Sequence, residues 1–126
     1  MDNTNLLQKH CVPCEGIGKA LSSQEAEEYL KKMDFWQLDQ SAKTISREYI
    51  MKNFMAAVKL VNRIAEVAEA ENHHPDVHLT GYRKLKVELS THALGGLSEN
   101  DFILAAKINQ LPADLRPAYH IMQKRQ

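Results

Sequence analysis

One amphipathic helix that runs into two adjacent histidines and a proline constrains this chain more than any other stretch. Asn53 can cap the helix, and apolar residues then recur at intervals of three and four, the spacing of one helix face. The helix should end near Asn72, because Pro75 disfavours helical geometry in the residue before it. The sequence therefore predicts a long helix that presents His73 and His74 together at its exit. Its main apolar line consists of Phe54, Ala57, Val58, Val61, Ile64, Ala65 and Ala68.

A second, thinner apolar line on the same helix consists of Ala56, Leu60 and Val67. A helix that packs one face against a sheet does not need both lines. Two interpretations are open: the helix is buried deeply within its own domain, or the second line forms a contact between subunits.

The rest of the chain alternates between helical and strand patterns. Ser22 and Ser98 open capping-box-like sequences, which predict one helix over about 23–33 and another that ends at Pro112. Alternating or β-prone runs predict four strands, over 35–38, 44–51, 77–82 and 84–91. The order helix, strand, strand, helix, strand, strand, helix favours an α+β fold, with the helices packed on one face of an antiparallel sheet.

The length and composition indicate one ordinary globular domain. We expect an irregular arm over 1–21, a folded domain over 22–111, and a basic tail over 112–126 that either docks or stays loose. Sixteen basic residues balance sixteen acidic ones, so charge does not indicate nucleic acid or a membrane surface as partner. No apolar run approaches the ~18 residues of a membrane span. The polar, acidic start is unlike a secretion signal, so we expect a cytoplasmic location.

The arm contains the only two cysteines of the chain, Cys11 and Cys14, in one Cys-x-x-Cys unit. Two thiolates are too few for a four-cysteine zinc site, although His10 or a second subunit could complete one. A redox Cys-x-x-Cys normally follows a strand and opens a helix, and no strand pattern precedes this one. We interpret the pair as reduced thiols that pack the arm, with the metal and redox interpretations as alternatives.

Histidines from two places could share one cleft if the long helix and the last strand are neighbours. His73 and His74 come from the helix exit, His92 from the end of the last strand, and Asp101 from the start of the last helix. Histidine exchanges protons near neutral pH, because its ordinary pKa is ~6.5. Such groups suit an elimination, in which an acid protonates a departing hydroxyl and a base removes a nearby proton, each step contributing roughly 10²–10⁴-fold.

Simpler interpretations exist for each of these residues. The histidine pair could interact only with the helix dipole, and Asp101 could be only the capping partner of Ser98. His78 points opposite to Val77 and Leu79 in the strand pattern, so we expect it at the surface. Three histidines and a carboxylate could also bind zinc or iron, but adjacent histidines point in divergent directions.

Taken together, these residues resemble the pterin-4a-carbinolamine dehydratase family, in its bacterial form. The resemblance covers roughly residues 11–110 and also includes Trp36 and the arm segment 11–16. It implies an α+β fold with a four-stranded antiparallel sheet and three helices, in agreement with the order above. It also implies a homodimer or homotetramer, which favours the subunit interpretation of the second apolar line. The motifs that carry it are Glu69-x-x-x-His73-His74-Pro75, Tyr82, Thr91-His92 and Gly95-Gly96-Leu97-Ser98-Glu99-Asn100-Asp101.

The activity that this resemblance implies is that of a hydro-lyase. The reaction is the dehydration of 4a-hydroxytetrahydrobiopterin to quinonoid dihydropterin, which recycles the cofactor of aromatic amino-acid hydroxylases and implies a functional link to phenylalanine hydroxylase. No metal or organic cofactor is implied, since the pterin is the substrate. By position, His73 and His92 correspond to the acid and base, and His74 completes the catalytic set by binding and placing the pterin. The carboxylates and walls of the site correspond to Glu69, Asp101, Pro75 and Thr91.

The chain departs from animal members of that family at three points. Residues 76–79 stand where animal members have an aromatic-rich segment, the interval from His74 to His92 is one residue longer, and Asn72 replaces an aspartate. The alternative function is a non-catalytic binding or regulatory module, because animal members also act as dimerisation partners of a homeodomain transcription factor. The presence of all three family histidines favours an enzyme, and nothing basic or groove-sized indicates direct DNA contact.

Overall fold

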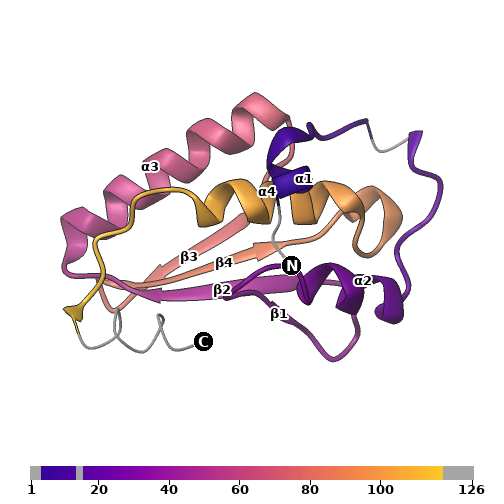
Figure 1. Ribbon diagram of the computed structural model, residues 1–126. Coiled ribbons are helices and arrows are strands. Elements are labelled where there is room, and N and C mark those ends of the chain that lie inside the picture. The colour runs from indigo at the N-terminus through magenta and orange to yellow at the C-terminus, as the bar shows by residue number, and fades with distance from the viewer. Residues whose placement is uncertain (1–3, 14–15, 118–126) are drawn as a thin grey trace.

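The computed structural model describes residues 4–13 and 16–117. It confirms the predicted α+β fold, with a four-stranded antiparallel sheet and three main helices (Figure 1). A short N-terminal helix and a 3₁₀ turn at His92–Leu94 are additional to that prediction. The helices and strands are α1 Thr4–Gln8, α2 Ser23–Leu30, β1 Gln37–Leu38, β2 Ile45–Ile50, α3 Phe54–Glu71, β3 Asp76–Thr80, β4 Lys84–Leu89 and α4 Glu99–Asn109.

The sheet has the strand order β1-β2-β4-β3, and all its neighbours are antiparallel. The central pair β2 and β4 is in register at Arg47 and Val87, and β3 joins β4 as a hairpin. Strand β3 ends at Thr80, two residues earlier than predicted, because Gly81 and Tyr82 both take positive φ angles and turn the chain. The hairpin therefore places the start of β3, and the segment before it, beside the end of β4.

The core lies between one face of the sheet and the helices α3 and α4, which cover that face (Figure 1). Alternate residues of β4 point into it, as the sequence predicts for a half-buried strand. Helix α4 is buried along almost its whole length, from Asn100 to Ala106 and at Ile108. Helix α2 packs against its first turns, where Tyr29 stacks on Phe102 with 4.7 Å between ring centroids. The N-terminus of α4 thus lies inside the domain, which places its first polar residues out of solvent.

The buried face of α3 takes in residues of both apolar lines. Ala56 and Leu60 of the second line are buried within the domain, with 7% and 0% of their surface exposed, and Val67 packs against the same core. Phe54, from the main line, is instead 51% exposed. Of the two interpretations of the second line, burial within the domain is therefore confirmed, and the subunit contact is wrong. Because α3 packs beside α4 as well as over the sheet, the buried face of the helix includes the second line.

Both ends of the described chain are tied to the domain. Residues of α1 pack against α4, and Leu6 is 5% exposed in the core, so a helix lies within the stretch that the sequence predicted as irregular. At the other end, Leu115 pairs with Met51 in an antiparallel bridge that extends the end of β2. The further turn predicted around Tyr119, Ile121 and Met122 lies outside the described residues.

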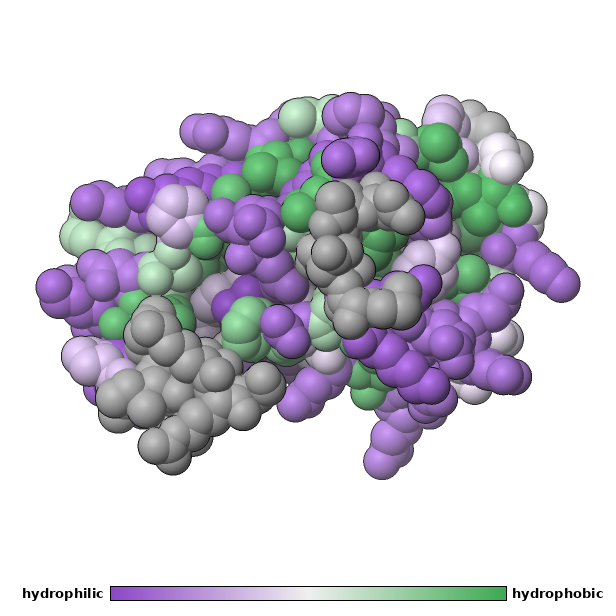
Figure 2. All heavy atoms as spheres, viewed as in Figure 1, coloured by the Kyte–Doolittle hydropathy of each residue, from purple (hydrophilic) through white to green (hydrophobic). Residues whose placement is uncertain are grey.

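Hydrophilic side chains cover most of the face seen in Figure 2, and apolar side chains appear there only in small separate patches. No helix in the described part of the chain is long and apolar enough to cross a membrane. Among the residues that the structure describes, the exposed large apolar side chains are Val12, Phe54, Met55, Val77 and Tyr82.

Candidate active site

The exit of α3 sends its two adjacent histidines into different environments. Asn72 takes the left-handed conformation, with φ 52° and ψ 41°, which asparagine tolerates better than most residues. Its N–H donates to the carbonyl of Glu69, and the N–H of His73 donates to that of Ala68, both at 3.2 Å. These two bonds are those of a Schellman motif, which ends a helix and reverses the chain. As a result His73 is buried, at 8% exposure, whereas His74 is exposed.

His73 contacts the carboxylate of Asp101, which comes from the first turn of α4. Nε2 of His73 lies 2.6 Å from Oδ1 of Asp101, and Asp101 is fully buried. The other oxygen, Oδ2, accepts from the hydroxyl of Thr91 at 2.8 Å and from the N–H of Ser98 at 3.0 Å. A buried carboxylate is costly unless donors surround it, and here three donors do. Asp101 is therefore both the capping partner of Ser98 and the partner of an imidazole.

This contact fixes how His73 can transfer protons. An ionised carboxylate only accepts hydrogen bonds, so His73 must hold a proton on Nε2. The opposite ring nitrogen, Nδ1, is then the one that can exchange a proton with a substrate. A carboxylate that holds the tautomer and orientation of an imidazole also occurs in hydrolytic triads and behind the histidine ligands of metal sites.

A second imidazole–carboxylate pair lies at the surface beside the first. Nε2 of His74 contacts Oε2 of Glu69, from the last turn of α3. Their side chains are 55% and 75% exposed, and Pro75, which follows, is partly buried. Because both groups reach solvent, they are available to a ligand that approaches the helix exit.

His92 follows directly after Thr91, at the start of the 3₁₀ turn. Thr91 is 1% exposed, and its hydroxyl is held by Asp101 and by the Ser98 hydroxyl, which lies 2.7 Å away. The turn ends at Gly95, whose φ of 65° favours glycine. The structure thus joins His73, Asp101 and Thr91 in one hydrogen-bonded set, pairs His74 with Glu69 separately, and presents His92 as an exposed residue next to Thr91.

Sequence reasoning did not identify one buried carboxylate near this set. Glu71 is the last residue of α3 and is 9% exposed. Burial alone would raise the pKa of Glu71, but the N–H of Cys11, the ring of His10 and the Lys107 ammonium outweigh it and hold the pKa below its ordinary value. A signal was present, because Glu71 follows Ala68 by three residues and so continues the buried face of the helix.

The surroundings of the Cys11 thiol favour its protonated form. Burial, with the negative charge of Glu71 and a hydrogen bond to it, raises its pKa to about 12. Redox exchange and zinc ligation both need the thiolate, so this environment favours the packing interpretation. Cys14 lies outside the described residues. Within the described ranges, no group of three histidine, cysteine or acidic side chains could hold a metal ion.

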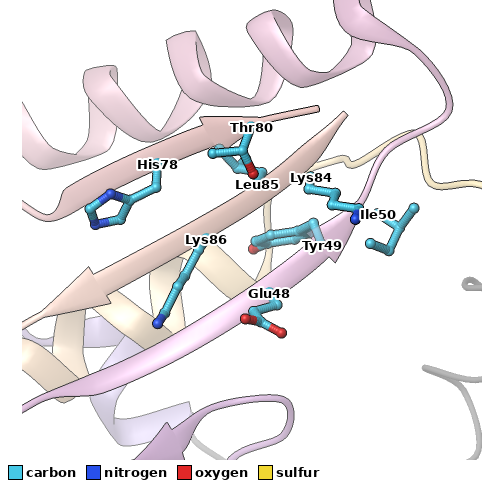
Figure 3. Close-up of a pocket in the computed structure, with 8 residues that line it drawn as sticks. All are labelled: Glu48, Tyr49, Ile50, His78, Thr80, Lys84, Leu85 and Lys86. Atoms are coloured by element: carbon cyan, nitrogen blue, oxygen red, sulfur yellow. The ribbon is translucent and has the colours of Figure 1, made fainter. Parts of the chain in front are cut away.

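A hollow on the sheet face opposite α3 and α4 is another place where a ligand could be considered. Figure 3 shows that it is lined by side chains of β2, β3 and β4, among them Glu48, His78, Lys84 and Lys86. His78 is 53% exposed and lies 2.7 Å from Glu88, which confirms its predicted surface position. None of the predicted site residues lines this hollow, so the candidate site is at the exit of α3.

Comparisons with known proteins bear on the same region. The family model described as Pterin 4 alpha carbinolamine dehydratase matches residues 19–111. A Halorhodospira halophila protein whose name is that of this dehydratase is 48% identical over 109 residues, which are 86% of this chain and 99% of that protein. Pterin-4-alpha-carbinolamine dehydratase 2, mitochondrial, from Arabidopsis thaliana is 43% identical over 113 residues, which are 87% of this chain and 60% of that protein. The crystal structure of a transcriptional coactivator/pterin dehydratase from Brucella melitensis matches with a TM-score of 0.67 and 32% identity, over 72% of this chain and 96% of that one.

Proposed function

The chain belongs to the pterin-4a-carbinolamine dehydratase family, and from this premise we propose that His73, oriented by Asp101, transfers a proton in the reaction. The protein is a hydro-lyase that dehydrates pterin-4a-carbinolamine. The observation that carries the proposal is the 2.6 Å contact between Nε2 of His73 and Oδ1 of a fully buried Asp101. It leaves one defined ring nitrogen for the substrate.

The reaction needs one proton donor and one proton acceptor. The bond from C4a to its hydroxyl oxygen breaks, and the oxygen leaves as water after it gains a proton. N5 loses its proton, and the N–H electron pair forms the C4a–N5 double bond of the quinonoid product. We assign the two transfers to His73 and His92, since general acid and base catalysis by positioned imidazoles contributes roughly 10²–10⁴-fold per step.

Binding falls to the groups around these two histidines. The exposed pair His74 and Glu69 offers a hydrogen-bond donor and an acceptor for the polar edge of a pterin ring. Pro75 follows His74 in the chain and Thr91 precedes His92, and in this proposal these two residues form the wall of the site.

Single alanine variants test these roles. His73→Ala and His92→Ala should each lower kcat by about 10² or more, while His74→Ala should mainly raise KM. The matched control is His78→Ala, which removes another exposed imidazole that is paired with a carboxylate, on the sheet face opposite α3 and α4. The assay is conversion of chemically generated 4a-hydroxytetrahydropterin to the quinonoid form. Full activity of both the His73 and the His92 variants would refute the assignment, and an unchanged KM for His74→Ala would remove its binding role.

We also propose a homodimer or homotetramer that works with phenylalanine hydroxylase in the cytoplasm. Three exposed apolar side chains, Phe54 and Met55 on α3 and Val77 on the edge strand β3, support association. Analytical ultracentrifugation of the wild-type protein and Phe54→Ser tests the assembly, and a monomeric wild-type protein would refute it.

The proposed link to phenylalanine hydroxylase is tested by adding this protein to the hydroxylase, whose turnover should become faster. Cell fractionation tests the proposed cytoplasmic location.

A further inference from the structure

The N-terminal arm spans the two backbone segments that carry His73 and Asp101, and we propose that it positions this pair for catalysis. Its anchor points are Glu71 and Asn100, which we infer to be positioning residues. The inference rests on the proposed roles of His73 and Asp101. It goes beyond them because neither anchor contacts the proposed reacting groups.

The first anchor joins the arm to the end of α3. Oε1 of Glu71 accepts from the N–H of Cys11 at 2.7 Å, and Oε2 lies 2.8 Å from Nδ1 of His10 and 3.5 Å from Nζ of Lys107. The carboxylate is thus held from the arm and from α4 together. Glu71 stands two residues before His73, so a displacement of Glu71 changes where the chain leaves the helix.

The second anchor joins the arm to the start of α4. The side-chain amide of Asn100 pairs with the backbone of Val12 in both directions: Val12 N–H donates to Oδ1 at 3.0 Å, and Nδ2 donates to the Val12 carbonyl at 2.8 Å. Asn100 is 2% exposed and directly precedes Asp101. The Cys11 thiol adds a longer contact of 3.5 Å to the Asn100 carbonyl.

The two anchors are reached by consecutive amides of the arm. The N–H of Cys11 binds Glu71, and the N–H of Val12 binds Asn100. Consecutive Cα atoms are ~3.8 Å apart across a trans peptide, so the arm acts as a spacer of fixed length between the ends of the two helices. The pair His73 and Asp101 comes from these same two ends, and a misplacement of ~1 Å in a catalytic geometry can reduce the rate about 10²-fold.

The arm has other contacts with α4 that supply a control. The ammonium of Lys9 lies 2.9 Å from Glu99, with both side chains well exposed. Exposed ion pairs of this kind contribute little to stability. Lys9→Ala therefore removes a contact between the same arm and the same helix without touching either anchor.

The experiment compares Asn100→Ala, Glu71→Ala and Glu71→Gln with Lys9→Ala, in the full chain and under the dehydratase assay. We expect kcat to fall about tenfold or more for Asn100→Ala and Glu71→Ala, with KM within about twofold of wild type. The kcat of Glu71→Gln should fall less, because the amide can still accept from the Cys11 N–H and donate to His10. The kcat of Lys9→Ala should equal that of the wild type. If Glu71→Ala does not fold, Asn100→Asp replaces it: this variant keeps the shape but turns an oxygen toward the Val12 carbonyl.

A spectroscopic readout in the substrate-free protein separates positioning from simple destabilisation. The Nε2 proton of His73 should give a strongly deshielded imidazole N–H resonance, which His73→Ala removes and thereby identifies. We expect this resonance to shift or broaden in Asn100→Ala and to stay unchanged in Lys9→Ala. A lower melting temperature with normal kcat and an unmoved resonance would overturn the inference. If His73→Ala itself keeps full activity, the proposed function of His73 fails instead, and the resonance still shows whether the arm holds the pair.

Discussion

The replacement Asp101→Asn tests the central pair of the site with almost no change of shape. Three donors point at the carboxylate: the ring of His73 on Oδ1, and the Thr91 hydroxyl and the Ser98 N–H on Oδ2. An amide has one accepting oxygen and one donating nitrogen. If the oxygen stays with Thr91 and Ser98, the NH₂ group faces Nε2 of His73. The imidazole must then move its proton to Nδ1, which is the wrong tautomer for the proposed transfer.

The contacts of Asp101 set the expected loss of stability and the expected loss of activity. Hydrogen bonds to a charged group contribute about 1.5–3 kcal/mol and neutral ones about 0.5–1.5 kcal/mol, but a neutral amide is also cheaper to bury. We therefore expect a net loss of about 1–2 kcal/mol in the free energy of unfolding, or about 4–8 °C in Tm for a domain of this size. Because general acid and base catalysis by one group contributes roughly 10²–10⁴-fold, kcat should fall within that range.

The assay measures kcat and Tm for the wild-type protein, Asp101→Asn and the control Asp114→Asn, which makes the same chemical change at an exposed position. The control should have the same kcat and the same Tm as the wild type. A kcat for Asp101→Asn within about threefold of wild type, in a folded protein, would show that Asp101 neither holds the tautomer of His73 nor stabilises its charge.

Two further predictions follow from the pKa shifts in the arm. With Cys14→Ser as background, the Cys11 thiol, whose pKa is raised to about 12, should react with iodoacetamide at pH 8 at least tenfold more slowly in the folded than in the unfolded protein, and equal rates would contradict the buried environment. For Glu71, whose pKa is lowered from 4.5, the carboxylate contributes its full stability above the unfolded pKa and loses it as pH falls through the folded pKa. The difference in Tm between wild type and Glu71→Gln should therefore shrink below about pH 4.5, and a constant difference from pH 7 to pH 3 would refute this role.

Much of the fold could be predicted because its signals are local. The spacing of apolar residues predicted α3 and β4, the cap at Asn53 and the proline at 75 predicted the two ends of α3 to within one residue, and the order of elements predicted the α+β class. These local patterns did not predict which surfaces pack against one another. For the second apolar line of α3 the pattern left burial and a subunit contact open, and the family resemblance favoured the subunit contact, but Ala56 and Leu60 face the domain's own core. Periodicity shows that such a line exists and not what covers it.

The residues of the candidate site were all visible in the sequence, but their relationships were not. The sequence by itself determined that two histidines leave one helix together, that a threonine and a histidine follow a strand, and that an aspartate lies at the start of the last helix, because caps, turns and periodicity act within a few residues. Only the tertiary structure decided that His73 is buried on Asp101, 28 residues away, while its neighbour His74 stays in solvent. The same holds for the arm, whose contacts to Glu71 and Asn100 join residues 60 and 88 positions apart. Such pairings depend on how α3, α4 and the arm pack in three dimensions, and no short-range pattern in the chain encodes that packing.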